Sequence, residues 1–200
     1  MANGLEEEIC TRWTHSSTAT GNAFLGSGKS APFGINGDGL TDLRGLCINQ
    51  FLKNATVRCV DLSGSYMDGF GQFGFCNVSE SRLAGARLGT NLGNKFTLCD
   101  FSHSDLSGAV LRGEFDEVDF TGARMNSTNA NQVIFRRCRF IQTVFRKATL
   151  LNCTFEDCVF DRCSFGSGSI AGSKFIRSSL ALDELKKTVI ENVVFADSIS

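Results

Sequence analysis

The sequence contains very few of the residues that usually perform catalysis, and it has no long apolar run. Its 200 residues include two histidines, one tyrosine, one tryptophan and one proline. His15 lies in a polar segment and His103 at an outward position, where a lone histidine is usually just solvated. We therefore expect no catalytic residues and no enzyme. No apolar run approaches the roughly 20 residues that a helix needs to span a bilayer, so we also expect no contact with a membrane.

An excess of charge of one sign is also missing. The chain carries 20 basic and 21 acidic residues, with a formal net charge of -1. Proteins that bind nucleic acids are usually markedly basic, so we expect no direct contact with nucleic acid.

The nine cysteines are an odd number, and they do not fit a disulfide framework or a metal site. The first ten residues, MANGLEEEIC, lack the charged and then apolar pattern of a secretory leader. No CxxC pair and no nearby histidine accompanies the cysteines of the repeat, which argues against zinc. We interpret the cysteines as reduced packing residues of a cytoplasmic protein, and we expect neither a cofactor nor a metal.

Phenylalanine is abundant, with 18 copies, and it recurs with a period of five. From Phe120 onward, every fifth residue but one is large and apolar, and the residue two positions earlier is small or β-branched. Neither a helix, with a period of 3.6, nor a strand, with a period of 2, produces this pattern. The chain must therefore coil, as internal repeats of fixed length do. The members of the series are Phe120, Met125, Ala130, Phe135, Phe140, Phe145, Leu150, Phe155, Phe160, Phe165, Ile170, Phe175 and Leu180.

Three segments carry a family resemblance. Asp105-Leu-Ser-Gly-Ala, Ala109-Val-Leu-Arg-Gly and Asp119-Phe-Thr-Gly-Ala resemble the A(D/N)LxG signature of pentapeptide-repeat proteins. The resemblance covers about Leu40 to Leu180. It implies an all-β fold, a right-handed quadrilateral β-helix in which four repeats make one coil, with about seven coils. Slips of the period near Met67, Leu88 and Leu111 indicate bulges or small loops.

This interpretation divides the chain into three parts: an irregular N-terminal cap or leader at 1–38, the β-helix at 39–180, and a C-terminal capping helix and tail at 181–200. In the last part, Leu182, Leu185 and Val189 fall on one helical face and Phe195 follows, which predicts a short amphipathic helix. Repeat proteins need such caps. In the gyrase-protecting members of the family the C-terminal end also forms a dimer, so the resemblance leaves open whether these four residues cap the rod or join two copies.

In the first part, residues 23–30 loosely resemble a phosphate-binding loop that ends at Lys29 and Ser30, with alanine in place of the first glycine. Such a loop needs a strand before it and a helix after it, and the sequence indicates neither. A nucleotide-dependent enzyme would rest on Lys29 alone.

The predicted exterior is charged but balanced. A coil of twenty residues places Asp116 and Glu117 beside Arg136 and Arg137, and these beside the next acidic pair, which predicts a ladder of ion pairs. Elsewhere we predict two candidate interaction patches, an acidic one and a basic one. The acidic patch comprises Asp100, Asp105 and Asp119, and the basic patch comprises Arg124, Arg146 and Lys147.

The best-known members of the family protect DNA gyrase or topoisomerase IV, and several are thought to imitate DNA with an acidic rod. The resemblance therefore implies a non-enzymatic rod that binds a protein, with a type II topoisomerase as the leading partner. The alternative is a structural scaffold or a secreted effector with no topoisomerase role. Fold alone does not choose between them.

Overall fold

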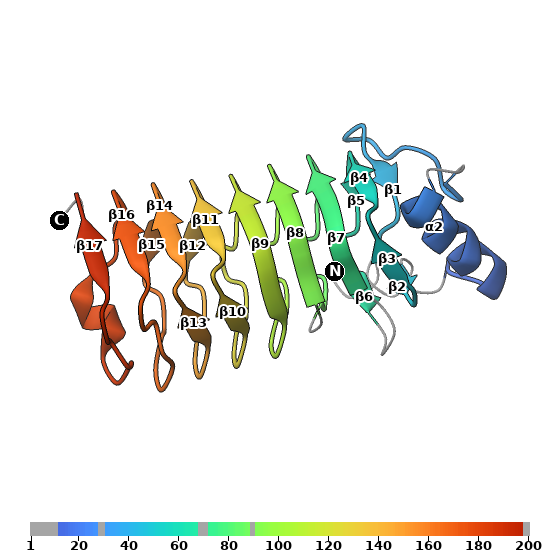
Figure 1. Cartoon of the computed structure of the whole chain (residues 1–200). Coiled ribbons are helices and arrows are strands. Elements are labelled where there is room, and N and C mark those ends of the chain that lie inside the picture. The colour runs from blue at the N-terminus through green and yellow to red at the C-terminus, as the bar shows by residue number, and fades with distance from the viewer. Residues whose placement is uncertain (1–11, 28–30, 68–71, 89–90, 198–200) are drawn as a thin grey trace, which may run out of the picture.

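The computed structural model describes residues 12–27, 31–67, 72–88 and 91–197. In it the chain winds into coils that stack along one axis as a β-solenoid, with a helix at the N-terminal end of the rod (Figure 1). The elements are α2 (His15–Ser27), β1 (Thr41–Asp42), β2 (Cys47–Ile48), β3 (Phe51–Lys53), β4 (Thr56–Arg58), β5 (Val60–Asp61), β6 (Tyr66–Met67), β7 (Gln72–Ser79), β8 (Asn91–Thr97), β9 (Val110–Asp116), β10 (Asn129–Asn131), β11 (Ile134–Arg136), β12 (Arg139–Ile141), β13 (Thr149–Leu151), β14 (Thr154–Glu156), β15 (Val159–Asp161), β16 (Lys174–Ile176), the 3-10 turn η1 (Leu182–Leu185) and β17 (Val194–Ala196).

Each turn of the solenoid has four faces, which we number by the core residues that they carry. Face 1 carries Phe135 and Phe155, face 2 Phe140 and Phe160, face 3 Phe145 and Phe165, and face 4 Ala130 and Leu150. On face 1 the strands pair in the order β4, β7, β8, β9, β11, β14, β16 and β17, and every pairing is parallel. The predicted β-solenoid, with about seven turns, is therefore confirmed, although the structure is mostly β and not all-β.

The phenylalanine rings of successive coils stack on one another inside the rod. On face 1, Phe155 lies between Phe135 and Phe175, with ring centroids 4.9 and 4.7 Å away and nearly parallel planes. Rings from face 2 meet this stack edge-on, as Phe160 does at 5.5 Å. Both arrangements are favourable for aromatic pairs, so the core consists of closely packed stacks of rings that also contact one another.

Where the small residue two positions before a core residue is serine, threonine or cysteine, it also has a polar role. The hydroxyl of Thr143 donates a hydrogen bond to the carbonyl of Phe120 at 2.8 Å, and the hydroxyl of Ser173 donates to that of Leu150 at 2.9 Å. Cysteines in the same slot do the same through sulfur, as Cys163 does to Phe140 at 2.9 Å. Buried carbonyl groups need a donor, which explains why serine, threonine and cysteine share this slot.

The coil length is regular only in the second half of the rod. Phe135 pairs with Phe155, 20 residues further along, whereas Val78 pairs with Phe96, 18 residues further along, and Val57 pairs with Val78 after 21. The register shifts between Phe73 and Cys76. The predicted slip between Leu88 and the following run therefore corresponds to a shortened coil.

The predicted C-terminal helix is wrong. The structure has only the 3-10 turn Leu182–Leu185, after which the chain returns to the coil: Val189 bridges to Ser169, and β17 pairs with β16. The period of five continues at Leu185, Ile190 and Phe195, although helical spacing also fits part of this segment. A helix of so few residues is marginal by itself, whereas the edge of β16 offers ready hydrogen bonds.

Among the described residues, the α-helix is instead α2, in the part of the chain that we predicted to be irregular. Leu25 of α2 is 3% exposed, and the side-chain amide of Asn22 donates a hydrogen bond to the carbonyl of Cys47 at 2.8 Å. Gly21 allows a close approach, because a Cβ there would lie 2.9 Å from the Trp13 ring and 3.1 Å from Leu46. Packing against the first coil stabilises α2. The polar composition of the helix does not by itself indicate this packing.

Candidate protein-interaction surfaces

The interior thiols are buried and hard to ionise. Cys99, Cys138 and Cys153 are each at most 2% exposed, and burial raises the pKa of Cys99 and of Cys153 to about 11. The described cysteines are free thiols, and the described residues contain no cluster of ligands that could hold a metal ion. Thiolate chemistry at neutral pH is therefore suppressed inside the rod.

We expect native thiols to differ widely in reactivity. A thiol reagent at pH 8 should modify the half-buried Cys59 within minutes and leave Cys99 and Cys153 unmodified for hours, since they are buried and protonated. Mass spectrometry of peptides checks this, with denatured protein as the fully modified control. Equal labelling of Cys59 and Cys153 in the native protein would contradict the buried assignment.

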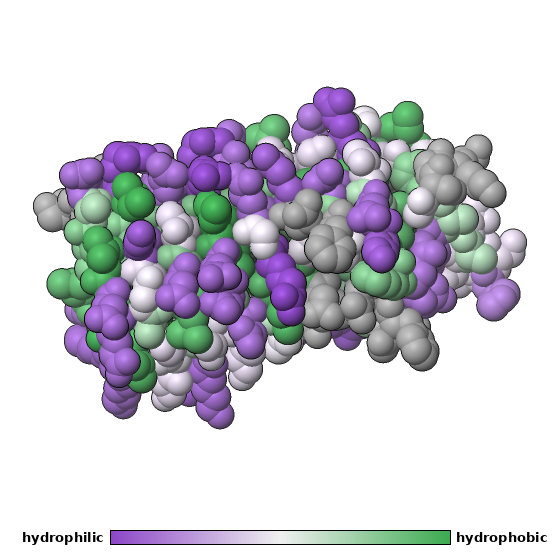
Figure 2. Space-filling model, in the orientation of Figure 1, coloured by the Kyte–Doolittle hydropathy of each residue, from purple (hydrophilic) through white to green (hydrophobic). Residues whose placement is uncertain are grey.

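The predicted ladder of ion pairs runs along the corner that follows face 1. Arg137 pairs with Glu117 at 3.1 Å, and Arg177 pairs with Glu156 at 2.8 Å and with Asp157 at 2.7 Å. Arg136 contacts both Glu114 and Glu156. Figure 2 shows this corner as a row of hydrophilic residues along the upper edge of the rod. Opposite charges alternate from coil to coil, so the row largely neutralises itself.

The predicted acidic and basic patches are less separate than the sequence indicated. Asp105 pairs with Arg124 of the next coil at 2.9 Å, and Asp119 lies 3.9 Å from Arg139. Each of the three aspartates also accepts a hydrogen bond from the backbone N–H two residues later, as Asp100 does from Ser102 at 2.8 Å. The aspartates therefore stabilise the turns of the repeat, which is why the signature favours Asp or Asn at this position.

Arg146 and Lys147 lie apart from Arg124, at the corner between faces 3 and 4. Backbone hydrogen bonds place Lys147 beside Gly166, and Ser167 beside Lys187. The corner thus presents two cationic pairs, Arg146 with Lys147 and Lys186 with Lys187, separated by a coil with small side chains. Within the described ranges no ion pair involves any of the four.

The C-terminal end of the rod exposes apolar side chains. Ile190 and Phe195 point along the core columns but are 47% and 37% exposed, because no further described coil covers them. Leu182 and Val189 are exposed beside them, whereas Leu185 is 2% exposed and covers the column of Phe165. Figure 2 shows hydrophobic residues gathered at this end. Of the four residues predicted to cap the rod or join two copies, Leu185 is therefore buried in the rod, and Leu182, Val189 and Phe195 are exposed.

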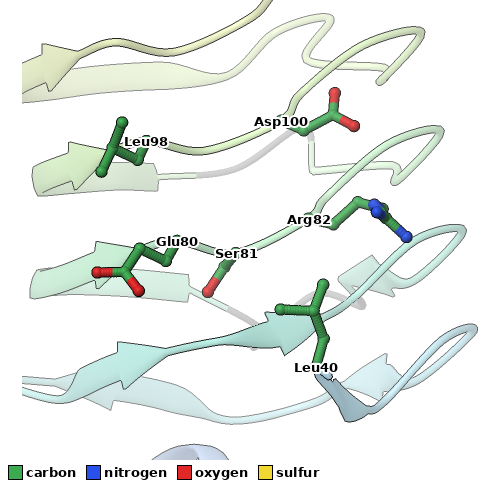
Figure 3. A pocket seen from close by; sticks show the side chains of 6 residues that line it. All are labelled: Leu40, Glu80, Ser81, Arg82, Leu98 and Asp100. Atoms are coloured by element: carbon green, nitrogen blue, oxygen red, sulfur yellow. The ribbon is translucent and has the colours of Figure 1, made fainter. Parts of the chain in front are cut away.

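A shallow pocket of about 330 Å³ opens on the side of the rod, at the shortened coils. Figure 3 shows its lining: Leu40 lies nearest the N-terminal end, Glu80, Ser81 and Arg82 follow β7, and Leu98 and Asp100 lie on the next coil. Of these residues only Asp100 was a predicted site residue. A leucine at a corner position, where the repeat elsewhere has glycine or a polar residue, was the signal that could have indicated the pocket.

The segment that resembles a phosphate-binding loop does not have the geometry of one. Residues 23–27 form the last part of α2, whereas a phosphate-binding loop precedes its helix. Lys29 itself lies outside the described residues, as does the start of the chain up to residue 11. None of the helices described in the structure is long and apolar enough to cross a membrane.

These features define a β-solenoid of five-residue repeats with a filled core and a patterned exterior. The family model described as pentapeptide repeats matches residues 114–150 in 8 copies. Residues 114–150 therefore consist of pentapeptide repeats, and the predicted resemblance to the pentapeptide-repeat family is confirmed.

Comparison with known proteins gave low identities. No curated protein matches the sequence. Among solved structures, a trypsin-treated variant of QnrB1, described as a plasmid-mediated fluoroquinolone resistance protein, is 17% identical with a TM-score of 0.38, over 70% of this chain and 91% of that one. HetL of the cyanobacterium Nostoc, described as involved in heterocyst differentiation regulation, is 17% identical with a TM-score of 0.26, over 78% and 86%. Rfr23 of the cyanobacterium Cyanothece 51142 is 16% identical with a TM-score of 0.28; the match spans 57% of this chain and 59% of Rfr23.

Proposed function

We propose that the protein is a non-enzymatic binding protein of the cytoplasm, which holds another protein through the rigid exterior of its rod. The observation that carries this proposal is the C-terminal end, where Ile190 and Phe195 leave core columns open. Exposed apolar side chains and an unpaired strand edge favour association, because covering them removes apolar surface from water and pairs backbone groups. Because side chains fill the interior, the binding surface that we propose lies on the outside of the molecule.

The occupant that we propose for this end is a second copy of the chain. A two-fold arrangement would bring the β17 edge of each copy face to face, and the exposed Val189 and Phe195 would meet their counterparts. The dimer would then be a rod of about twice the length, since seven pairings at about 4.8 Å each give roughly 34 Å per copy.

The partner that we propose for the dimer is a type II topoisomerase, DNA gyrase or topoisomerase IV. Support comes from the resemblance to the pentapeptide-repeat family, whose best-known members protect these enzymes, and from the rod-like shape with an apolar end. The shape alone does not identify a partner.

A supercoiling assay tests both proposals together. We expect titration with the protein to inhibit gyrase, or to protect it from a quinolone, and Ile190→Asp to weaken the effect about tenfold by charging the dimer interface. Analytical ultracentrifugation should show the same variant as a monomer. Asn129→Asp, which adds the same charge at an exposed position on face 4, is the control and should behave as the parent protein.

Two outcomes would count against the proposals. If Ile190→Asp sediments as a dimer, as Asn129→Asp does, the C-terminal interface is refuted. No effect on supercoiling at any concentration would refute the topoisomerase, and it would favour a scaffold or effector role. The ladder of alternating charges supports that second candidate, because a row that neutralises itself does not offer the acidic surface of duplex DNA. A pull-down that returns a reproducible partner other than a topoisomerase would support it.

A further inference from the structure

The side pocket contains a leucine in an unfavourable place. Leu98 has a φ of 53°, in the left-handed region, where most side chains other than those of Asn, Asp and Gly are strained. Among the described non-glycine residues with positive φ, it is the one aliphatic residue, and its side chain is 49% exposed. Folding gains nothing from such a placement, since a polar residue or glycine would fit this corner better.

The walls of the pocket combine apolar surface with an unbalanced negative charge. Arg82 is held by Asp38 at 2.8 Å and by the buried Asp61 at 3.5 Å, so two carboxylates share its one positive charge. Glu80 is occupied by Arg58 at 2.8 Å. Asp100 has no cation within ion-pair distance among the described residues, and one of its oxygens accepts the hydrogen bond from Ser102. Among the residues that line the pocket, two carboxylates, Glu80 and Asp100, stand against one guanidinium group, Arg82.

We propose that this pocket takes the side chain of a lysine or arginine that a partner protein presents; the proposal rests on the protein-binding function proposed above. The aliphatic stem would lie against Leu40 and Leu98, and the charged end would reach Asp100, which is the arrangement that long cationic side chains favour on apolar surface. A volume of about 330 Å³ is at the small end for ligand pockets, which suits a single side chain.

Methyl NMR of the full chain, with leucine methyl groups labelled, tests this without any topoisomerase. We expect the peptide acetyl-Gly-Lys-Gly-amide to shift the methyl signals of Leu40 and Leu98 with a Kd on the order of millimolar. The matched peptide with norleucine, which has a stem of similar length and no charge, should bind at least about fivefold more weakly. Shifts of equal size with both peptides would overturn the assignment to a cation, and so would the absence of shifts at these two leucines.

Two variants separate the pocket from general electrostatics. Asp100→Asn keeps an oxygen for the Ser102 N–H and removes the charge, so binding of the lysine peptide should weaken about fivefold. Asp105→Asn removes the same charge from the equivalent turn on face 3, outside the pocket, and should leave binding unchanged. An equal loss in both variants would show attraction to the whole surface and refute the site.

Leu98→Asn gives an independent measurement. Asparagine tolerates positive φ better than leucine, so the melting temperature should rise or stay the same while affinity for the lysine peptide falls. Unchanged affinity would refute a binding role for Leu98. Loss of peptide binding with normal inhibition of gyrase would reject the pocket alone, whereas peptide binding without an effect on gyrase would reject the topoisomerase alone.

Discussion

Phe155→Ala should lower the free energy of unfolding by about 3–5 kcal/mol, the largest effect that we expect from a single core substitution. Phe155 is fully buried, and it touches rings above and below it as well as on face 2. Its removal opens a cavity in a stack that cannot close, because strand pairing holds the neighbouring coils at a fixed spacing. Urea denaturation followed by circular dichroism measures the loss.

Asn131→Ala is the matched control for this substitution. Asn131 lies in β10, the strand on face 4, with its side chain exposed, and its polar contact is a hydrogen bond of 3.4 Å from Asn152. We expect a change of less than about 0.5 kcal/mol, as for most surface positions. Similar losses at both positions would mean that the inward and outward assignments are wrong.

Asp42→Ala should release the N-terminal helix from the rod, with a loss of about 2–4 kcal/mol in the stability of this cap. The side chain of Asp42 is 9% exposed and binds two guanidinium groups: Arg12 through bonds of 2.7 and 2.8 Å, and Arg44 through bonds of 2.9 and 3.0 Å. Removal of the carboxylate leaves two partly buried cations side by side. Trp13, the single tryptophan, donates a hydrogen bond to the carbonyl of Arg44, so its fluorescence reports on the release.

The contact of Asp42 with the two arginines also predicts how the stability of the N-terminal cap depends on pH. Burial alone would raise the pKa of Asp42, but the hydrogen bonds from Arg12 and then from Arg44 outweigh it and hold the pKa well below its usual value of 3.8. The stabilisation is therefore complete above about pH 4 and is lost as the pH falls further toward the native pKa. We expect an acid transition in Trp13 fluorescence that is absent from Asp42→Ala. The persistence of the same transition in the variant would assign it to other groups.

Local patterns in the sequence predicted much of the rod and part of its surface. The period of five indicated the core residues, and a coil of twenty residues placed Arg136 beside Glu156, as the structure confirms. The same arithmetic did not apply before Phe115, where coils of 21, 18 and 19 residues shift the register. The side pocket lies in this region, so its lining could not be assembled by counting residues.

At the two ends of the rod, the period of the sequence was not enough to predict the structure. At the C-terminal end, the sequence near Leu182 and Leu185 fits both a helical period and the period of five. The coil forms because its last strand, β17, pairs with the edge of β16. At the N-terminal end, the helix has no clear apolar stripe of its own. It is held by particular contacts of Trp13 and Asn22 with the first coil.

The sequence by itself therefore determined what repeats: the core columns, the small residues of the inner slot and the ladder of charges. Each follows from a spacing that is constant from Phe115 onward, so a local rule describes it there. Only the tertiary structure decided what does not repeat: the covers of the two ends, the shortened coils and the pocket beside Leu98. Those features depend on surfaces that exist only after the coils have stacked, because packing and strand edges then outweigh the weak preferences of short segments.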